Sequence, residues 1–245
     1  MLKKILIIAK TYPCISKKYG ELVCTAGITE SGKFIRLYPI AFRELSKKHR
    51  YKKYQWIEVN LKKDKSDPRK ESYKVVGNIK LLNILDTRNY WHERKYQVLK
   101  NVYYSKVKLI ENCNLKGKSV SLAYFKPACL VSFHIETVKN LSDNDTYQLP
   151  FKFFYKFTDI YGISSRLQII DWEISELTRK LFRQYKNDIL KIKSILRQKY
   201  FYDMLNKDIY LFLGTNKQWH IRKSPNPFMI ISIFYPPKLE VANAV

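Results

Sequence analysis

The sequence predicts an α+β fold, and three observations favour it. Short strand-like segments occupy both ends and the middle of the chain, two long segments have helical character, and the two kinds of element do not alternate. Regular alternation would indicate a parallel sheet with crossover helices, so we expect mixed or antiparallel strands forming a partly open barrel or sheet. We expect a single domain over residues 1–245. The alternative division is a basic, β-rich part (1–85) and a helix-containing part (86–245).

The strands of the first third are predicted from apolar runs bounded by turn residues. The expected strands are 3–10, 21–28, 34–38, 55–62 and 73–85. Ser31-Gly32 is typical of the turn of a hairpin, and Gly77 predicts a bulge in the last strand. Residues 63–72 (KDKSDPRKES) contain a proline and no apolar side chain, which predicts a loop.

Two long helices and several further strands are predicted in the remainder. One helix, at about 86–113, begins where Asp86-Thr87 can act as a cap. The other, at about 171–206, begins at Asp171 and has one continuous apolar face. The expected strands are two within 119–139, interrupted at Lys126-Pro127, then strand-like residues 147–170 around Gly162, then 208–213 and 227–235, with a polar loop at 140–146.

The net charge is the most unusual property of the sequence. Forty-six Lys and Arg residues face 21 Asp and Glu, a formal charge of +25, although 46% hydrophobic content is ordinary for a globular protein. Such a field attracts polyanions, so nucleic acid is the expected partner and an acidic protein the alternative. No stretch approaches the roughly 18 apolar residues of a membrane span, and the run Ile5–Ala9 is too short for a signal peptide. We therefore expect a cytoplasmic protein without a membrane partner.

Cysteine and histidine spacing gives no sign of a metal or a cofactor. The four cysteines form no CxxC pair and the four histidines are far apart, so we expect no structural zinc and buried free thiols. The sequence has no P-loop, GxGxxG or GxSxG motif. Common nucleotide-hydrolysing, dinucleotide-binding and esterase sites are therefore not predicted.

A basic–aromatic cluster in residues 34–56 indicates nucleic-acid binding. Lysine and arginine neutralise phosphates, and exposed aromatic rings stack on unpaired bases for about 1–3 kcal/mol each, which favours single-stranded or structured RNA or DNA. A second basic stripe lies opposite the apolar face of the helix at 171–206. The predicted binding residues are Lys17, Lys18, Tyr19, Arg36, Tyr38, Arg43, Lys47, Lys48, Arg50, Lys52, Lys53, Trp56, Arg69, Arg179, Arg183 and Lys186.

Two alternatives to simple nucleic-acid binding remain open. Glu21, Asp67 and Glu71, with His220, could serve an enzyme acting on nucleic acid or a nucleotide, such as a nuclease or a transferase. Lysines and arginines surround these carboxylates, which also favours plain ion pairs. The other alternative is a subunit whose cations dock on an acidic protein. The sequence names no reaction.

Overall fold

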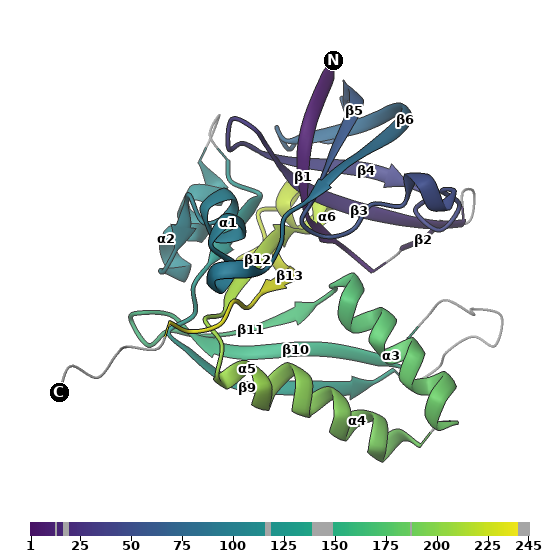
Figure 1. Cartoon of the computed structure of the whole chain (residues 1–245). Coiled ribbons are helices and arrows are strands. Elements are labelled where there is room, and N and C mark those ends of the chain that lie inside the picture. Colours follow the sequence, from purple (N-terminus) through teal and green to yellow (C-terminus); the bar gives the residue numbers. More distant parts are fainter. Residues whose placement is uncertain (13, 17–19, 116–118, 139–148, 187, 240–245) are drawn as a thin grey trace.

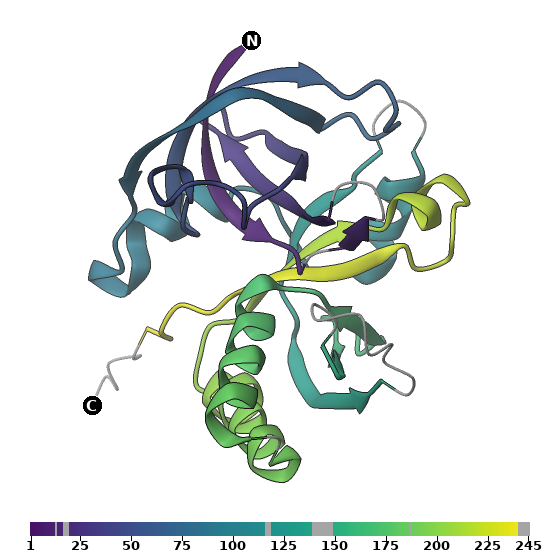
Figure 2. The same ribbon diagram turned by 90° about the vertical axis from the view of Figure 1, so that its right-hand side faces the viewer.

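Two strand-rich halves lie side by side in the computed structural model (Figures 1 and 2). The structure describes residues 1–12, 14–16, 20–115, 119–138, 149–186 and 188–239. The strands up to Ile84 form one half, and those from Val102 onward form the other. In Figure 1, β12 and β13 lie between the N-terminal strands and the layer made by β9, β10 and β11.

The N-terminal half is a closed five-stranded barrel. Its strands and one 3₁₀ turn are β1 (Leu2–Lys10), β2 (Cys14–Ser16), β3 (Gly20–Thr29), β4 (Phe34–Ile40), η1 (Lys47–His49), β5 (Gln55–Lys63) and β6 (Ser72–Ile84). Hydrogen bonding runs β1–β3–β4–β6–β5 and returns to β1, with β2 added at the edge of β3. Only β4 and β6 pair in parallel. With the five ring strands numbered along the chain, the order is 1-2-3-5-4-1, the topology of OB barrels.

Strand β1 shows why its sequence is a continuous apolar run. Ile5 and Ile7 point into the barrel, whereas Leu6 and Ile8 pack toward the C-terminal half. Over Ile5–Ala9 neither face of the strand meets water, so the usual polar alternation is absent there. Gly27 on β3 permits this packing, because a Cβ there would lie 2.3 Å from Cγ2 of Ile5.

The C-terminal half repeats the same strand order. Its strands are β7 (Val102–Tyr103), β8 (Leu122–Phe125), β9 (Cys129–Thr137), β10 (Phe151–Thr158), β11 (Ser164–Ile169), β12 (Tyr210–Thr215) and β13 (Phe228–Phe234). Residues 126–128 alone separate β8 from β9; β8 pairs with β12, and β9 pairs with β10. The seven strands form one sheet in the order β7-β8-β12-β13-β11-β10-β9, with parallel pairs β7–β8 and β11–β13. When β8 and β9 are counted as one interrupted strand, the order becomes the ring β8/β9–β10–β11–β13–β12. We call the two halves the first and second barrel.

The helices are α1 (Arg88–Val98), α2 (Lys106–Asn114), α3 (Trp172–Tyr185), α4 (Ile189–Arg197), a π-helical turn (Gln198–Tyr202), α5 (Asp203–Leu205) and α6 (Lys217–Ile221). The structure divides both predicted helices. Strand β7 separates α1 from α2, and Ser105 caps α2 by accepting from the Lys108 amide. Lys186, in the left-handed conformation, ends α3, and Asp188 caps α4. Internal capping residues thus break apolar patterns that look continuous in the sequence.

Most other predicted elements are confirmed within the described residues. Asp171 caps α3 by accepting from the Glu173 amide at 2.7 Å. The bulge is present, since Gly77 has φ +75° where the register between β5 and β6 shifts. The predicted loop 140–146 lies outside the described residues. No helix in the described ranges is long and apolar enough to cross a membrane.

Three apolar clusters hold the molecule together, and one is shared by both barrels. The first fills the first barrel, and the second fills the second barrel beneath α3 and α4. The shared cluster lies between them, where Ile28 and Phe34 of the first barrel pack with Tyr124 and Phe212 of the second. A backbone hydrogen bond from Tyr12 to the Ile170 carbonyl, 2.7 Å, adds to this contact.

Candidate nucleic-acid interface

The outer surface of β9, β10 and β11 combines aromatic and cationic side chains. Residues 151–158 (FKFFYKFT) alternate strictly, with Phe151, Phe153, Tyr155 and Phe157 buried in the second barrel. Lys152, Phe154, Lys156 and Thr158 therefore point outward. Helices α3 and α4 pack on the inner side, so they leave this surface open.

Cross-strand pairing assembles a compact set of side chains around Phe154. His134 of β9 and Gln168 of β11 lie directly opposite Phe154, and Arg166 of β11 lies opposite Lys156. The guanidinium carbon of Arg166 is 3.7 Å from the centroid of the half-buried Phe154 ring. We call this set the outer face: His134, Lys152, Phe154, Lys156, Arg166 and Gln168.

The outer face has an excess of positive charge. Glu136 is the acidic residue next to it, and it forms an ion pair with Arg166. Lys152 and Lys156 are exposed and have no ion-pair partner among the described residues. An aromatic ring that is partly open to solvent and flanked by unpaired lysines suits stacking of a base with neutralisation of adjacent phosphates.

Arg36, placed by its sequence in the basic–aromatic cluster, is instead buried between the barrels. Its side chain is 4% exposed, and Nη2 donates to the carbonyl of Ser121 at 3.2 Å and to Ser121 Oγ at 3.1 Å. Oε1 of Glu71 lies 3.8 Å from the same nitrogen. The guanidinium therefore joins β4 to the residue that precedes β8, and in this arrangement it is turned away from solvent.

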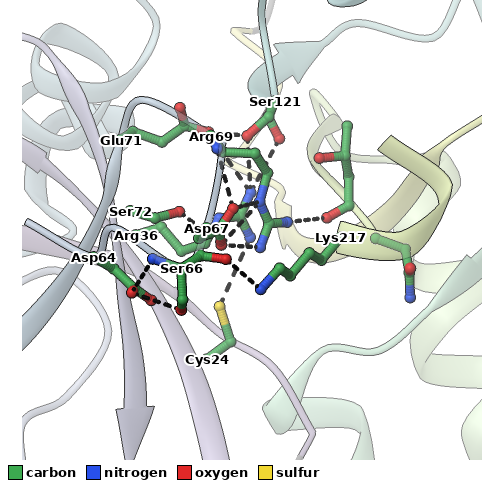
Figure 3. A network of polar contacts seen from close by, with 12 residues as sticks. Cys24, Arg36, Asp64, Ser66, Asp67, Arg69, Glu71, Ser72, Ser121 and Lys217 are labelled. Carbon is green, nitrogen blue, oxygen red and sulfur yellow. Dashed lines mark hydrogen bonds and ion pairs between the residues drawn. The ribbon is translucent and has the colours of Figure 1, made fainter. Parts of the chain in front are cut away.

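Arg69 and Asp67 form a second polar joint between the barrels (Figure 3). Arg69 Nε donates to Asp67 Oδ1 at 2.9 Å, and Nη1 donates to the carbonyl of Thr215 on β12 at 2.7 Å. Burial alone would raise the pKa of Asp67, but the hydrogen bonds and charge of Arg69, with a bond from Ser72, hold that pKa well below its usual range. Both side chains are 8% exposed, so they act as structural partners.

The candidate catalytic carboxylates do not converge on a common point in the described part of the chain. Asp67 is held by Arg69, and Glu71 accepts a hydrogen bond from Ser121 beside Arg36. The backbone of Glu21 pairs in β3, but its side chain is outside the description, as are Lys17, Lys18 and Tyr19. Among the described residues, no group of three His, Cys, Asp or Glu side chains is arranged to hold a metal.

His220 lies beside the buried thiol of Cys113 and the hydroxyl of Ser119. Its Nδ1 is 3.6 Å from Cys113 Sγ, and its Nε2 is 3.4 Å from Ser119 Oγ. Burial, followed by the positive charge of Arg69, lowers the pKa of His220. Burial likewise raises the pKa of the Cys113 thiol, which keeps it protonated and weakly nucleophilic.

The remaining predicted residues separate into exposed and engaged groups. Those with exposed side chains are Tyr38, Lys47, Lys48, Arg50, Lys52, Arg183 and Lys186. Lys53 is engaged, because Nζ donates to Glu173 and to the carbonyl of Ile233, both at 3.0 Å. Trp56 is half-buried against the shared cluster.

One group of predicted arginines is brought together from distant segments. Arg43 of the first barrel forms an ion pair with Glu176 of α3 and lies over the Trp172 ring. Arg43, Arg179 and Arg183 border one cleft of about 340 Å3. Arg179 is held in turn by Tyr12 Oη, which accepts from Nε at 2.9 Å.

The sequence prediction did not include the outer face. Its signal was present in the period-two pattern of 151–158, where Lys152, Phe154 and Lys156 share one side of a strand. The prediction recognised this region as aromatic and strand-like without separating its two faces. Arg166 has no local signal, because only strand pairing places it over Phe154.

Comparisons with known proteins add two family matches. Residues 1–100 match the model "Domain of unknown function (DUF8758)", and residues 135–245 match "Domain of unknown function (DUF8757)". No curated protein matches the sequence.

Two solved structures resemble the chain at low similarity. A replication protein A heterotrimer bound to ssDNA aligns with a TM-score of 0.42 and 8% identity, over 98% of this chain and 49% of that chain. The present chain thus spans about half the length of that one. A murine DNA binding protein bound with ds DNA aligns with a TM-score of 0.32 and 9% identity, over 98% of this chain and 97% of that chain. Similarity at this level indicates neither a shared ligand nor a shared activity.

Proposed function

We propose that the protein binds single-stranded nucleic acid along the outer face of the second barrel. The observation that carries the proposal is the half-exposed Phe154 ring, with Arg166 stacked on it and Lys152 and Lys156 unpaired on the same strand. The Arg166 guanidinium and the ring together offer a platform for a base, and the lysines offer contacts to the phosphates on either side of that base.

The distribution of charge supports a polyanionic ligand. The formal charge of +25 provides long-range attraction, and the buried ion pairs of Arg36 with Glu71 and of Arg69 with Asp67 lie between the barrels, away from the outer face. A duplex keeps its bases stacked on one another, so it has no free base to place on Phe154. This favours single strands, and it leaves RNA and DNA to be separated by experiment.

The geometry gives less support to the alternative of phosphodiester cleavage. Asp67 and Glu71 are engaged by Arg69, Arg36 and Ser121, and such contacts compete with a divalent cation for the carboxylate oxygens. The contacts that these residues make join the two barrels, so stability is the role that their positions support.

A pair of charge-matched variants tests the proposed surface. Lys152→Glu/Lys156→Glu reverses two charges on the outer face, and Lys47→Glu/Lys48→Glu reverses two exposed charges on the first barrel. Fluorescence anisotropy with a labelled single strand of about 15 nucleotides, of DNA or RNA, measures affinity. We expect a loss of about 100-fold or more for the outer-face variant and a much smaller loss for the other.

The opposite order would move the interface to the basic–aromatic cluster of the first barrel. Equal losses would mean that net charge, rather than a defined surface, attracts the ligand. Binding of the wild-type protein should also weaken with salt, with a log–log slope of about −0.7 for each phosphate contact. A slope near zero would remove the nucleic-acid proposal altogether.

A further inference from the structure

A cleft of about 510 Å3 lies at the junction of the two barrels, apart from the outer face. Its walls come from the end of β1, the loop that leads into β5, helix α1, the first turns of α3 and the residue that follows β13. The volume falls within the usual range for sites of small molecules. We call it the junction cleft.

The acidic groups of the junction cleft already have cationic partners. Glu173 accepts a hydrogen bond from Lys53 at 3.0 Å, and Lys53 also lies 4.0 Å from Asp171. Glu176 forms its ion pair with Arg43. Two cations thus offset most of the charge of these three carboxylates, which reduces their repulsion of an incoming anion.

Three further cations border the cleft without a carboxylate within 4 Å among the described residues: Lys10, Lys52 and Arg94. Arg94 donates Nε and Nη2 to the carbonyl of Leu85, at 2.9 and 2.6 Å, which fixes its guanidinium with a neutral partner. Lys52 is exposed at the rim. The cleft therefore has a net positive charge suited to a small anion.

Lys10 is the most deeply placed of the three cations. Its Nζ lies 4.2 Å from the Phe42 ring centroid and 5.4 Å from that of Trp172, with one weak hydrogen bond of 3.4 Å to the Tyr51 carbonyl. Burial lowers its pKa to about 8, even though Glu173 and Asp171 act to raise it. A cation that has lost part of its hydration gains more from a bound anion than an exposed lysine does.

Aromatic rings line the same space. Trp91, Trp172 and Tyr235 are half-exposed, and Tyr54 is buried with no hydrogen-bond partner for its hydroxyl. Arg94 lies over both Tyr54 and Trp91, at 4.4 and 5.0 Å from their centroids. Planar π-systems can therefore stack here beside fixed positive charges.

The backbone that positions two of these rings is strained. Tyr54 has φ +61° and Trp91 has φ +62°, and the two residues before Trp91 are also left-handed. A bulky residue in this region costs on the order of 1–3 kcal/mol, and such strain gathers at sites where a side chain must point in one direction. Both strained residues border the junction cleft.

We infer that the junction cleft binds one nucleoside phosphate, with the base against the tryptophan rings and the phosphate near Lys10, Lys52 and Arg94. The ligand can be a free nucleotide or the phosphorylated end of a strand, because both present the same chemical group. The inference does not depend on the outer face, since the two sites share no residue.

Intrinsic tryptophan fluorescence provides the test, because two of the four tryptophans border the cleft. Adenosine 5′-monophosphate is titrated into the wild-type protein and into Lys52→Glu, with Lys62→Glu as a control that has the same charge change at an exposed position near the other end of β5, outside both proposed sites. We expect saturable quenching with an affinity about tenfold lower in Lys52→Glu and unchanged in Lys62→Glu. Lys52 is exposed, so the variant keeps its fold, and a matching thermal melt checks this.

Several results would overturn the inference. Adenosine binding as tightly as its monophosphate would remove the role of the cations, and inorganic phosphate binding as tightly would remove the role of the rings. Absence of quenching by both the monophosphate and a 5′-phosphorylated oligonucleotide would exclude the site. The last two comparisons are made in the outer-face variant. Tighter binding of a 5′-phosphorylated than of a 5′-hydroxyl oligonucleotide assigns the cleft to strand ends. Tighter binding of the monophosphate than of the 5′-phosphorylated oligonucleotide assigns it to free nucleotide.

Discussion

Arg166 on β11 lies over Phe154 on β10, with its guanidinium carbon 3.7 Å from the ring centroid. The two residues come from neighbouring antiparallel strands. Arg166 also forms an ion pair with Glu136 of β9, which restrains its side chain. A base that reaches the outer face therefore meets a stacked cation and ring that are already in position. Less side-chain entropy is lost on binding than with a mobile surface aromatic.

Replacing Phe154 should separate binding from stability. Phe154→Ala removes a half-exposed ring, so we expect a loss of about 1–3 kcal/mol in single-strand affinity with a small change in unfolding midpoint. Phe153→Ala, one position along the strand, removes a buried ring and should cost about 3–5 kcal/mol in unfolding free energy. Anisotropy and urea unfolding measure the two effects. Unchanged affinity in Phe154→Ala would show that no base stacks there.

The contact between Asp67 and Arg69 should make the free energy of unfolding depend on pH in the acidic range. The folded-state pKa of Asp67 is depressed, so its contribution is complete above its unfolded pKa, about 4, and is lost as pH falls toward the folded value. Asp67→Asn should cost about 3–5 kcal/mol near pH 7, because it leaves Arg69 buried without its partner.

The difference in stability between Asp67→Asn and the wild-type protein should shrink as pH is lowered below about 4. Thermal melts across this range measure it. Asp86→Asn is the control, because Asp86 also has a lowered pKa and an arginine partner but is exposed to solvent. A difference that stays constant with pH would contradict the assignment of an ionised Asp67.

The left-handed turn at the start of α1 predicts an unusual response to glycine. Tyr90 is exposed with φ +51° and ψ +36°, a conformation that costs an L-residue about 1–2 kcal/mol and glycine almost nothing. Tyr90→Gly should therefore keep or raise the unfolding midpoint. Tyr96→Gly, in the regular part of the same helix, should lower stability by about 1 kcal/mol. Equal destabilisation by both changes would mean that residue 90 is helical.

Nucleotide binding in the junction cleft should weaken in alkaline solution. Lys10 has a pKa of about 8, and the charged groups that face it are Glu173, Asp171, Lys53 and Glu176. Above pH 8 the free protein loses the Lys10 charge, so affinity for adenosine 5′-monophosphate should fall toward a tenfold loss per pH unit. Lys10→Arg keeps its charge and should flatten the profile between pH 7 and 9.5. A wild-type profile that is equally flat would place the phosphate away from Lys10.

Local patterns in the sequence were sufficient to predict most strands. Gly77, the hairpin at Ser31-Gly32 and the interruption at Lys126-Pro127 are each encoded by neighbouring residues, and the structure has all three. The division of the helices was harder to predict, because Ser105 and Asp188 act as caps only once the chain around them has turned.

The candidate site could not be derived in the same way, because its contacts join distant positions. Arg36 alternates as an exposed strand residue would, yet it bonds to Ser121, 85 positions away. His220 meets Cys113 across 107 positions, and Arg166 reaches Phe154 only through the register of two strands. Burial of a particular cation depends on which barrel surface covers it, and that is a property of the assembled fold.

The apolar cluster shared by the two barrels fixes the spacing between the outer face and the junction cleft. Ile28 and Phe34 pack against Tyr124 and Phe212, and this buried contact opposes rotation of one barrel against the other. The distance between the two proposed sites is therefore set by this packing. A strand too short to reach both gains nothing from the second site, whereas one that just spans them acquires a high effective concentration there. Affinity should then rise in a step at the oligonucleotide length that reaches both sites. That length depends on the distance between the sites and not on any single contact.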